Sequence, residues 1–184
     1  MTFLARRGKG ETMEIVTARL RLRPARMDDL EAMHAVLAHP DAMRWWSTLP
    51  HVEINQTRTW LGSMIENADA GAADFVVEYQ SQVIGKAGCW RLPEVGYILH
   101  PRAWGQGLGR EAVSAVIDHV FATCDVQALS ADVDPANTAS IRLLESLGFV
   151  RTGQANATIL VGDQWMDSLY YALERSCWSS PVKG

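Results

Sequence analysis

The sequence predicts one mixed α/β domain, in which most strands follow one another and helices interrupt them at a few points. A chain of 184 residues suits a single domain with a sizeable core. Its apolar fraction of 48% and charged fraction of 21% are those of an ordinary globular protein. Because the strand patterns are not each followed by a helix, a regular strand–helix alternation is not expected.

The chain is expected to begin with one strand followed by two helices. Residues 17–24 (TARLRLRP) alternate leucines with arginines, which is typical of a half-buried strand. Asp28 is the expected N-cap of the next helix, with Glu31 three residues on, as in a capping box. Apolar residues at helical spacing predict a second helix around residues 54–67.

The rest of the chain is expected to contain six strands and two helices. Strands are predicted at residues 74–79, 82–90 and 94–99, and a helix follows from about Gly109 to Thr123. The remaining expected elements are a strand at 126–133, a helix over 137–149 closed by Gly148 as a left-handed cap, and strands around Val150 and over 166–173.

The stretch HPRAWGQGLGREAV, residues 100–113, places Gly105, Gly107 and Gly109 directly before a helix. Such loops often bind phosphate through backbone N–H groups. A Walker loop is excluded because no lysine and hydroxyl residue follow the last glycine. The dinucleotide fingerprint fits poorly, since its glycine spacing differs and too little chain remains for a doubly wound sheet. The glycine loop by itself is also compatible with a tight turn that binds no ligand.

Composition and charge exclude several classes of protein. A net charge of −4 gives no electrostatic footprint for nucleic acid, and it suits an amine-bearing substrate slightly better than an anionic one. No apolar run approaches the roughly 18 residues of a membrane span. Three scattered cysteines fit a reducing cytoplasm. His34 and His39 lack partners at metal-ligand spacing, so no metal is expected.

One domain is expected over residues 14–178, without repeats or an internal linker. Residues 1–13 form an expected N-terminal extension, either a disordered tail or sequence ahead of a true start at Met13. Residues 179–184 form a short expected C-terminal tail.

Several motifs in this order closely resemble the GNAT superfamily of acyl-CoA N-acyltransferases, and within it the RimJ/RimL-like ribosomal-protein N-acetyltransferases. The resemblance implies a central mixed, twisted sheet of about seven strands flanked by helices, with strands 4 and 5 parallel and splayed apart. The stretches that carry it are TARLRLRPARMDDLEAM, HPDAMRWW, EVGYILHPRAWGQGLGREAV, NTASIRLLESLGF and DSLYYALERSCW.

The resemblance also implies acetyl-CoA as cosubstrate. Backbone N–H groups of the glycine loop would bind its pyrophosphate. The strands at 94–99 and 126–133 would hold its pantetheine arm between them. Trp104 stands where the family usually has Arg or Gln. The implied coenzyme-binding residues are Ile98, Leu99, His100, Trp104, Gly105, Gln106, Gly107, Leu108, Gly109 and Asn137.

Two residues receive catalytic roles from the resemblance. Glu94 would act as the base, through water, that deprotonates the attacking amine; an exposed turn carboxylate is the alternative. Many relatives place a tyrosine as general acid where this chain has Leu144. Ser140 is the expected replacement, although a helix serine can also bond back to a carbonyl.

The expected activity is acetyl transfer from acetyl-CoA to a primary amine, either a protein N-terminal α-amine or a small-molecule amine. Direct attack within a ternary complex is expected. A catalytically silent acyl-CoA-binding module is the alternative. Trp45 and Trp46 are adjacent and cannot both face one core direction, so one of them is a candidate for the acceptor pocket. Packing or a homodimer contact also accounts for these tryptophans.

Overall fold

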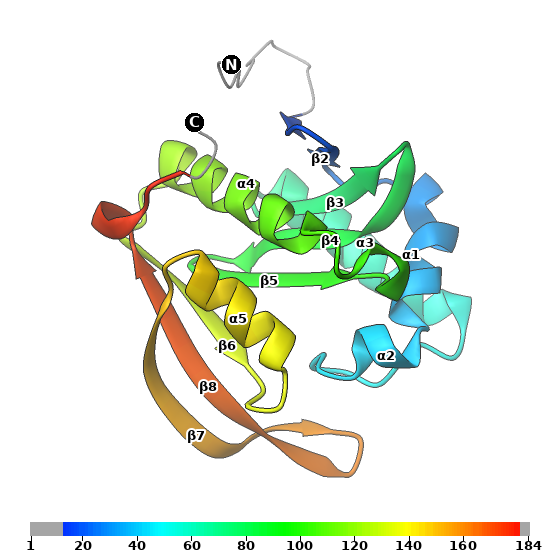
Figure 1. The fold of residues 1–184 in the computed structure, drawn as a ribbon. Helices are drawn as coiled ribbons and strands as arrows, with labels where there is room; N and C mark the ends of the chain where they lie inside the picture. Colours follow the sequence, from blue (N-terminus) through cyan, green and yellow to red (C-terminus); the bar gives the residue numbers. More distant parts are fainter. Residues whose placement is uncertain (1–12, 181–184) are drawn as a thin grey trace.

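The computed structural model describes residues 13–180, which form an eight-stranded mixed sheet between two groups of helices (Figure 1). The strand order is β1-β2-β3-β4-β5-β6-β8-β7. Neighbouring strands are antiparallel except β5 and β6, which are parallel. The predicted fold class is confirmed, and the strand beyond the expected seven is the two-residue β1. Most of the expected extension and the last four residues of the expected tail lie outside the described residues.

The elements follow the predicted order except for β1 and the short helix α2, which were not predicted, and the last two strands are longer than predicted. The strands are β1 (Ile15–Val16), β2 (Leu20–Arg23), β3 (Ala73–Tyr79), β4 (Gln82–Arg91), β5 (Glu94–Leu99), β6 (Ala128–Val133), β7 (Val150–Val161) and β8 (Gln164–Glu174). The α-helices are α1 (Leu30–Leu37), α2 (Pro40–Met43), α3 (Ile54–Asp69), α4 (Leu108–Thr123) and α5 (Thr138–Ser146). Short 3₁₀ turns occupy Met27–Asp29, Pro101–Ala103 and Arg175–Cys177.

The start of the first helix differs from the predicted capping box. Asp29, rather than Asp28, accepts a hydrogen bond of 2.8 Å from the backbone N–H of Arg26. Asp29 is buried and also accepts bonds of 2.8 and 2.6 Å from the guanidinium of Arg23 on β2. The prediction was wrong because Arg23 on the preceding strand bonds Asp29 and not Asp28. The spacing of residues within the helix cannot show such a partner.

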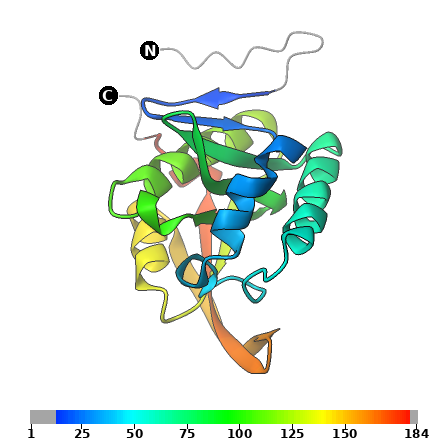
Figure 2. The same cartoon turned by 90° about the vertical axis from the view of Figure 1, so that its right-hand side faces the viewer.

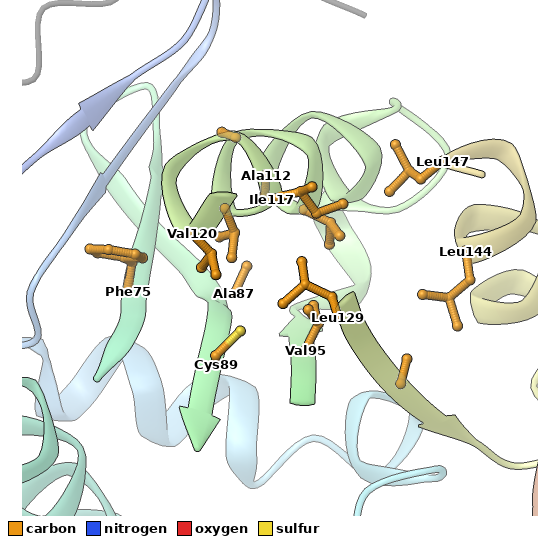
Figure 3. Close-up of a cluster of buried hydrophobic side chains, with 14 of the residues drawn as sticks. Phe75, Ala87, Cys89, Val95, Ala112, Ile117, Val120, Leu129, Leu144 and Leu147 are labelled. Carbon is orange, nitrogen blue, oxygen red and sulfur yellow. The ribbon is translucent and has the colours of Figure 1, made fainter. Parts of the chain in front are cut away.

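The sheet separates two apolar cores. Helix α4 packs on one face, where Ile117 and Val120 belong to the same buried cluster as Phe75 on β3 (Figure 3). Helices α1 and α3 cover the other face (Figure 2), where Met33 and Leu61 are fully buried. Because side chains alternate along a strand, β3 and β5 contribute to both cores. The two faces together fix the position of the central strands.

The parallel strands β5 and β6 meet only at one end. Glu94 is in register with Ser130, whose N–H donates to the Pro93 carbonyl at 3.0 Å. Beyond this point β5 stays paired with β4, and β6 stays paired with β8. The expected splay is therefore confirmed, and it opens the middle of the sheet beside the start of α5.

Candidate active site

The glycine loop ends in a helix N-terminus with free backbone donors. Gly105 and Gly107 have φ values of 71° and 75°, in the left-handed region that glycine adopts more readily than other residues. Gly107 is the N-cap of α4, and its carbonyl accepts the N–H of Glu111 at 3.1 Å. The N–H groups before Glu111 have no partner within the helix. Backbone N–H groups at a helix N-terminus are the kind of donors that can bind an anion such as phosphate.

A cleft of about 460 Å³, here called the coenzyme cleft, runs from this loop to α5. Most of the residues predicted to bind coenzyme line it, namely Ile98, Leu99, Trp104, Gly105, Gly107, Leu108, Gly109 and Asn137. Arg110 and Arg142 line it too, and the sequence analysis missed both. Their positive charge suits the phosphates of a coenzyme, and their positions beside two recognised motifs could have suggested them.

His100 and Gln106, which were also predicted to bind coenzyme, are engaged by protein groups. The Nδ1 atom of His100 accepts the backbone N–H of Arg102 at 3.2 Å. The backbone N–H of His100 donates to the Ile84 carbonyl on β4 at 2.8 Å. Gln106 Nε2 donates to the Arg102 carbonyl at 2.9 Å. These contacts shape the turn between β5 and the glycine loop.

Trp104 ties the glycine loop to the end of β5. Its indole Nε1 donates to the Leu99 carbonyl at 2.9 Å, while half of the residue's surface stays exposed. The bond holds the Trp104 ring along the wall of the coenzyme cleft. An aromatic residue at this position therefore orders the loop through a neutral hydrogen bond, where the family usually has a longer polar side chain.

A second cleft of about 580 Å³, here called the acceptor cleft, is lined by carboxylates and tryptophans. Lys86 also lines it, but this lysine is buried and bonds both oxygens of Asp74, at 2.9 and 3.1 Å. Arg91 is the other cation among the lining residues. The carboxylates are Glu94, Asp132, Asp134 and Asp167, and the tryptophans are Trp45, Trp46, Trp60 and Trp90. The cleft is therefore electronegative.

The two clefts share five lining residues, here called the junction residues: Trp45, Trp46, Tyr97, Asn137 and Ser140. Asn137 is the N-cap of α5, and its Oδ1 accepts the Ser140 N–H at 3.2 Å. The Oη of Tyr97 and the Oγ of Ser140 lie 2.6 Å apart. Burial raises the pKa of Tyr97 to about 12, although the hydrogen bond with Ser140 works in the opposite direction.

Tyr97 is the junction residue that the sequence analysis missed. It shares one face of β5 with Val95 and Leu99, which are buried in the core that α4 and α5 cover. This period of two could have placed its ring on the face where α5 begins. Glu94, by contrast, is exposed at the start of β5, and it lines the acceptor cleft but not the coenzyme cleft.

Among residues 13–180, no helix combines the length and the apolar character that a membrane span requires. No group of three or more His, Cys, Asp or Glu side chains in the range is arranged to hold a metal ion.

Comparison with known proteins identifies the family. The family described as acetyltransferase (GNAT) domain matches residues 19–150. The chain belongs to this family and is a GNAT N-acetyltransferase, whose acetyl donor is acetyl-CoA. The superfamily predicted from the motifs is confirmed.

Three relatives show how far the similarity extends. The uncharacterized N-acetyltransferase p20 of Bacillus licheniformis is 29% identical, over 76% of this chain and 83% of its own length. The [ribosomal protein uS5]-alanine N-acetyltransferase of Escherichia coli is 30% identical, over 54% of this chain and 55% of its own. A solved GNAT-family acetyltransferase from Bacillus anthracis is 26% identical and superposes with a TM-score of 0.77, covering 89% of this chain and 99% of that one.

Proposed function

We propose that this protein transfers the acetyl group of acetyl-CoA directly to a primary amine while both substrates are bound. The observation that carries the proposal is the meeting of two clefts at shared junction residues. One cleft begins at an anion-binding helix N-terminus and the other is electronegative, so the two suit different substrates. An acetyl group at the junction would be within reach of an amine in the acceptor cleft.

The coenzyme cleft has the features that acetyl-CoA requires. The backbone N–H groups between Gly105 and Arg110 would bind the pyrophosphate, assisted by the side chains of Arg110 and Arg142. The amide nitrogen of Asn137 would bond the pantetheine, because its Oδ1 already accepts the Ser140 N–H. The parted edges of β5 and β6 would receive the pantetheine arm.

The acceptor is an amine, either the α-amine of a protein N-terminus or that of a small molecule. The carboxylates of the acceptor cleft would attract the protonated amine, and its tryptophans offer faces on which a cation can pack. Glu94 would take the proton, through water, before attack. An α-amine with an ordinary pKa near 7.7–8.0 needs only a modest base, whereas a lysine amine near 10.4 needs a stronger one.

Acetyl-CoA binding by calorimetry tests the proposal, with Gly107→Glu as the disabling variant. This substitution adds a side chain and a negative charge in the phosphate loop. Gly71→Glu is the matched control, since Gly71 also has a positive φ (98°) and nothing within 4 Å of an added Cβ. We expect binding in the wild type and in Gly71→Glu, and loss of binding in Gly107→Glu.

Turnover is then measured as amine-dependent release of free thiol, with peptides bearing free N-termini and with linear polyamines. Release with either class supports transfer to an amine. Acetyl-CoA binding without thiol release across both classes would favour the silent acyl-CoA-binding module. A folded wild type that fails to bind acetyl-CoA would overturn the proposed function.

A further inference from the structure

The hydroxyl groups of Tyr97 and Ser140 connect β5 with the start of α5, beside the gap between β5 and β6. Tyr97 lies in β5 and Ser140 in the first turn of α5, and their oxygens are 2.6 Å apart where the clefts meet. The backbone N–H of Ser140 is already bonded to Asn137, so the side-chain hydroxyl is a separate group. A pair of hydroxyls uses one proton in its mutual bond, and the accepting hydroxyl keeps its own proton for another partner.

The chemistry of the two groups decides which one donates. A phenol is a far stronger hydrogen-bond donor than an alkyl alcohol, because its ordinary pKa is near 10 whereas serine does not titrate in water. Burial raises the pKa of Tyr97 to about 12, so the phenol keeps its proton at physiological pH. On this ground we assign the Tyr97 O–H as the donor to Ser140 Oγ, which leaves the Ser140 proton for another partner.

We infer that Tyr97 is a positioning residue, which by donating to Ser140 directs the Ser140 hydroxyl proton to the sulfur of the coenzyme as the thioester breaks. The inference rests on the proposed function. In that reaction the amine nitrogen forms a bond to the acetyl carbon, and the carbon–sulfur bond breaks with its electron pair left on sulfur. The proton of the amine goes to Glu94 or its water. The thiolate accepts a hydrogen bond from Ser140 and is later protonated from solvent.

Relative acidity excludes a full proton transfer from Tyr97. A thiol has an ordinary pKa near 8.5, so a phenol with a pKa of about 12 would protonate a thiolate with an equilibrium unfavourable by more than about 10³-fold. A hydrogen bond to the thiolate needs no such transfer and stabilises the charge directly. The hydroxyl pair thus replaces the helix tyrosine of many relatives, whose position holds the buried Leu144.

The test is the pKa of the coenzyme A thiol when it is bound to the protein, followed by the ultraviolet absorbance of the thiolate across a pH series. This readout needs no acceptor amine, and a purely structural role of Tyr97 would not change it. In the wild type we expect the bound thiol pKa to lie about one to two pH units below its value in free coenzyme A, because a donated hydrogen bond favours the charged form. Ser140→Ala should abolish this shift, and Tyr97→Phe should remove part of it.

The double variant and a tyrosine control separate positioning from direct contact. Tyr97→Phe added to Ser140→Ala should change the thiol pKa no further, since the effect passes through Ser140. Tyr170→Phe, which alters a part-exposed tyrosine on β8, should behave as the wild type. An unchanged thiol pKa in Tyr97→Phe would overturn the inference. So would a Tyr97→Phe effect on the thiol pKa that is equally large in the wild type and in Ser140→Ala. Coenzyme A binding, measured in the same samples, keeps this outcome distinct from failure of the proposed function.

Discussion

Arg19 and Glu111 form an ion pair of 2.7 Å between the turn that precedes β2 and the first turn of α4. The same guanidinium donates to the Gln106 carbonyl at 2.8 Å, so one side chain links the glycine loop to the sheet. Thr17 donates a further hydrogen bond to Glu111. Hydrogen bonds and the ion pair hold the pKa of the Glu111 carboxyl below its usual value, against the opposing effect of burial, which is the largest single influence.

Replacing Arg19 should weaken coenzyme binding more than it weakens the fold. Arg19→Gln frees the loop, which must then be ordered at a cost when acetyl-CoA binds. We expect affinity to fall about 3- to 10-fold, with less than about 1 kcal/mol lost from the free energy of unfolding, since the pair is part-exposed. Arg21→Gln is the control, because Arg21 pairs with Glu14 and Glu78, away from the loop. Equal affinities in the two variants, measured by calorimetry, would contradict this role.

Glu94→Gln should abolish most turnover while acetyl-CoA binding stays unchanged. Loss of a general base costs about 10²- to 10⁴-fold in rate. Asp167→Asn is a matched control in the same cleft, and an asparagine oxygen can still accept the Ala157 N–H that Asp167 binds at 2.9 Å. We expect this control to raise the KM of the amine and to spare kcat. Wild-type kcat in Glu94→Gln would exclude Glu94 as the base.

The Lys86–Asp74 ion pair should be costly to break from one side. Both side chains are buried, with 3% and 0% of their surface exposed. Lys86→Met leaves a buried carboxylate without a partner, and we expect a loss of about 3–5 kcal/mol in the free energy of unfolding. Adding Asp74→Asn removes the unpaired charge and should recover part of the lost free energy of unfolding. Urea denaturation measures both variants, and a double variant as unstable as the single one would refute the explanation.

Acidification should destabilise the fold through His51. Its pKa is lowered by burial and by the neighbouring His34, and both rings contact the hydroxyl of the buried Thr57 at 2.8 Å. The unfolded chain therefore binds more protons than the folded one as the pH falls below about 6.5, so the stability present at higher pH is lost on acidification.

Thermal unfolding between pH 8 and pH 5 measures this effect. Burial also lowers the pKa of His100 and His119, so the wild-type slope contains their contributions. His51→Gln should flatten the slope because it removes one of the titrating groups. A slope unchanged by this substitution would show that His51 does not contribute to the loss.

The sequence predicted most of the elements and the motifs, because their signals are local, but it missed the short elements β1 and α2. The alternation in residues 17–24 predicted β2, and the glycine loop predicted the start of α4 within one residue. The contacts of Arg19 could not be predicted in this way, since its partners on the loop and on α4 lie about 90 residues further along the chain. The strand pattern places Arg19 directly before β2 but does not show which groups it binds.

Tyr97 was missed for a related reason. Its neighbours in the sequence indicate a strand, whereas its partner Ser140 lies 43 residues away. Ser140 itself was selected through the family resemblance, so only one half of the hydroxyl pair was foreseen. Local sequence patterns predict elements and loops well, but they cannot predict pairs of side chains that tertiary packing brings together.

Because of the long β7–β8 hairpin, the residues lining the two clefts differ in how freely they can change during evolution. Its residues, among them Ile159, Met166 and Asp167, line the acceptor cleft. The residues lining the coenzyme cleft lie between Asp41 and Ser146, before the hairpin begins. Under the proposed function, substitutions near the hairpin tip would change which amine binds and would leave the residues of the coenzyme cleft unaltered. Duplicated copies of such a gene could acquire new acceptors through changes confined to one end of the chain.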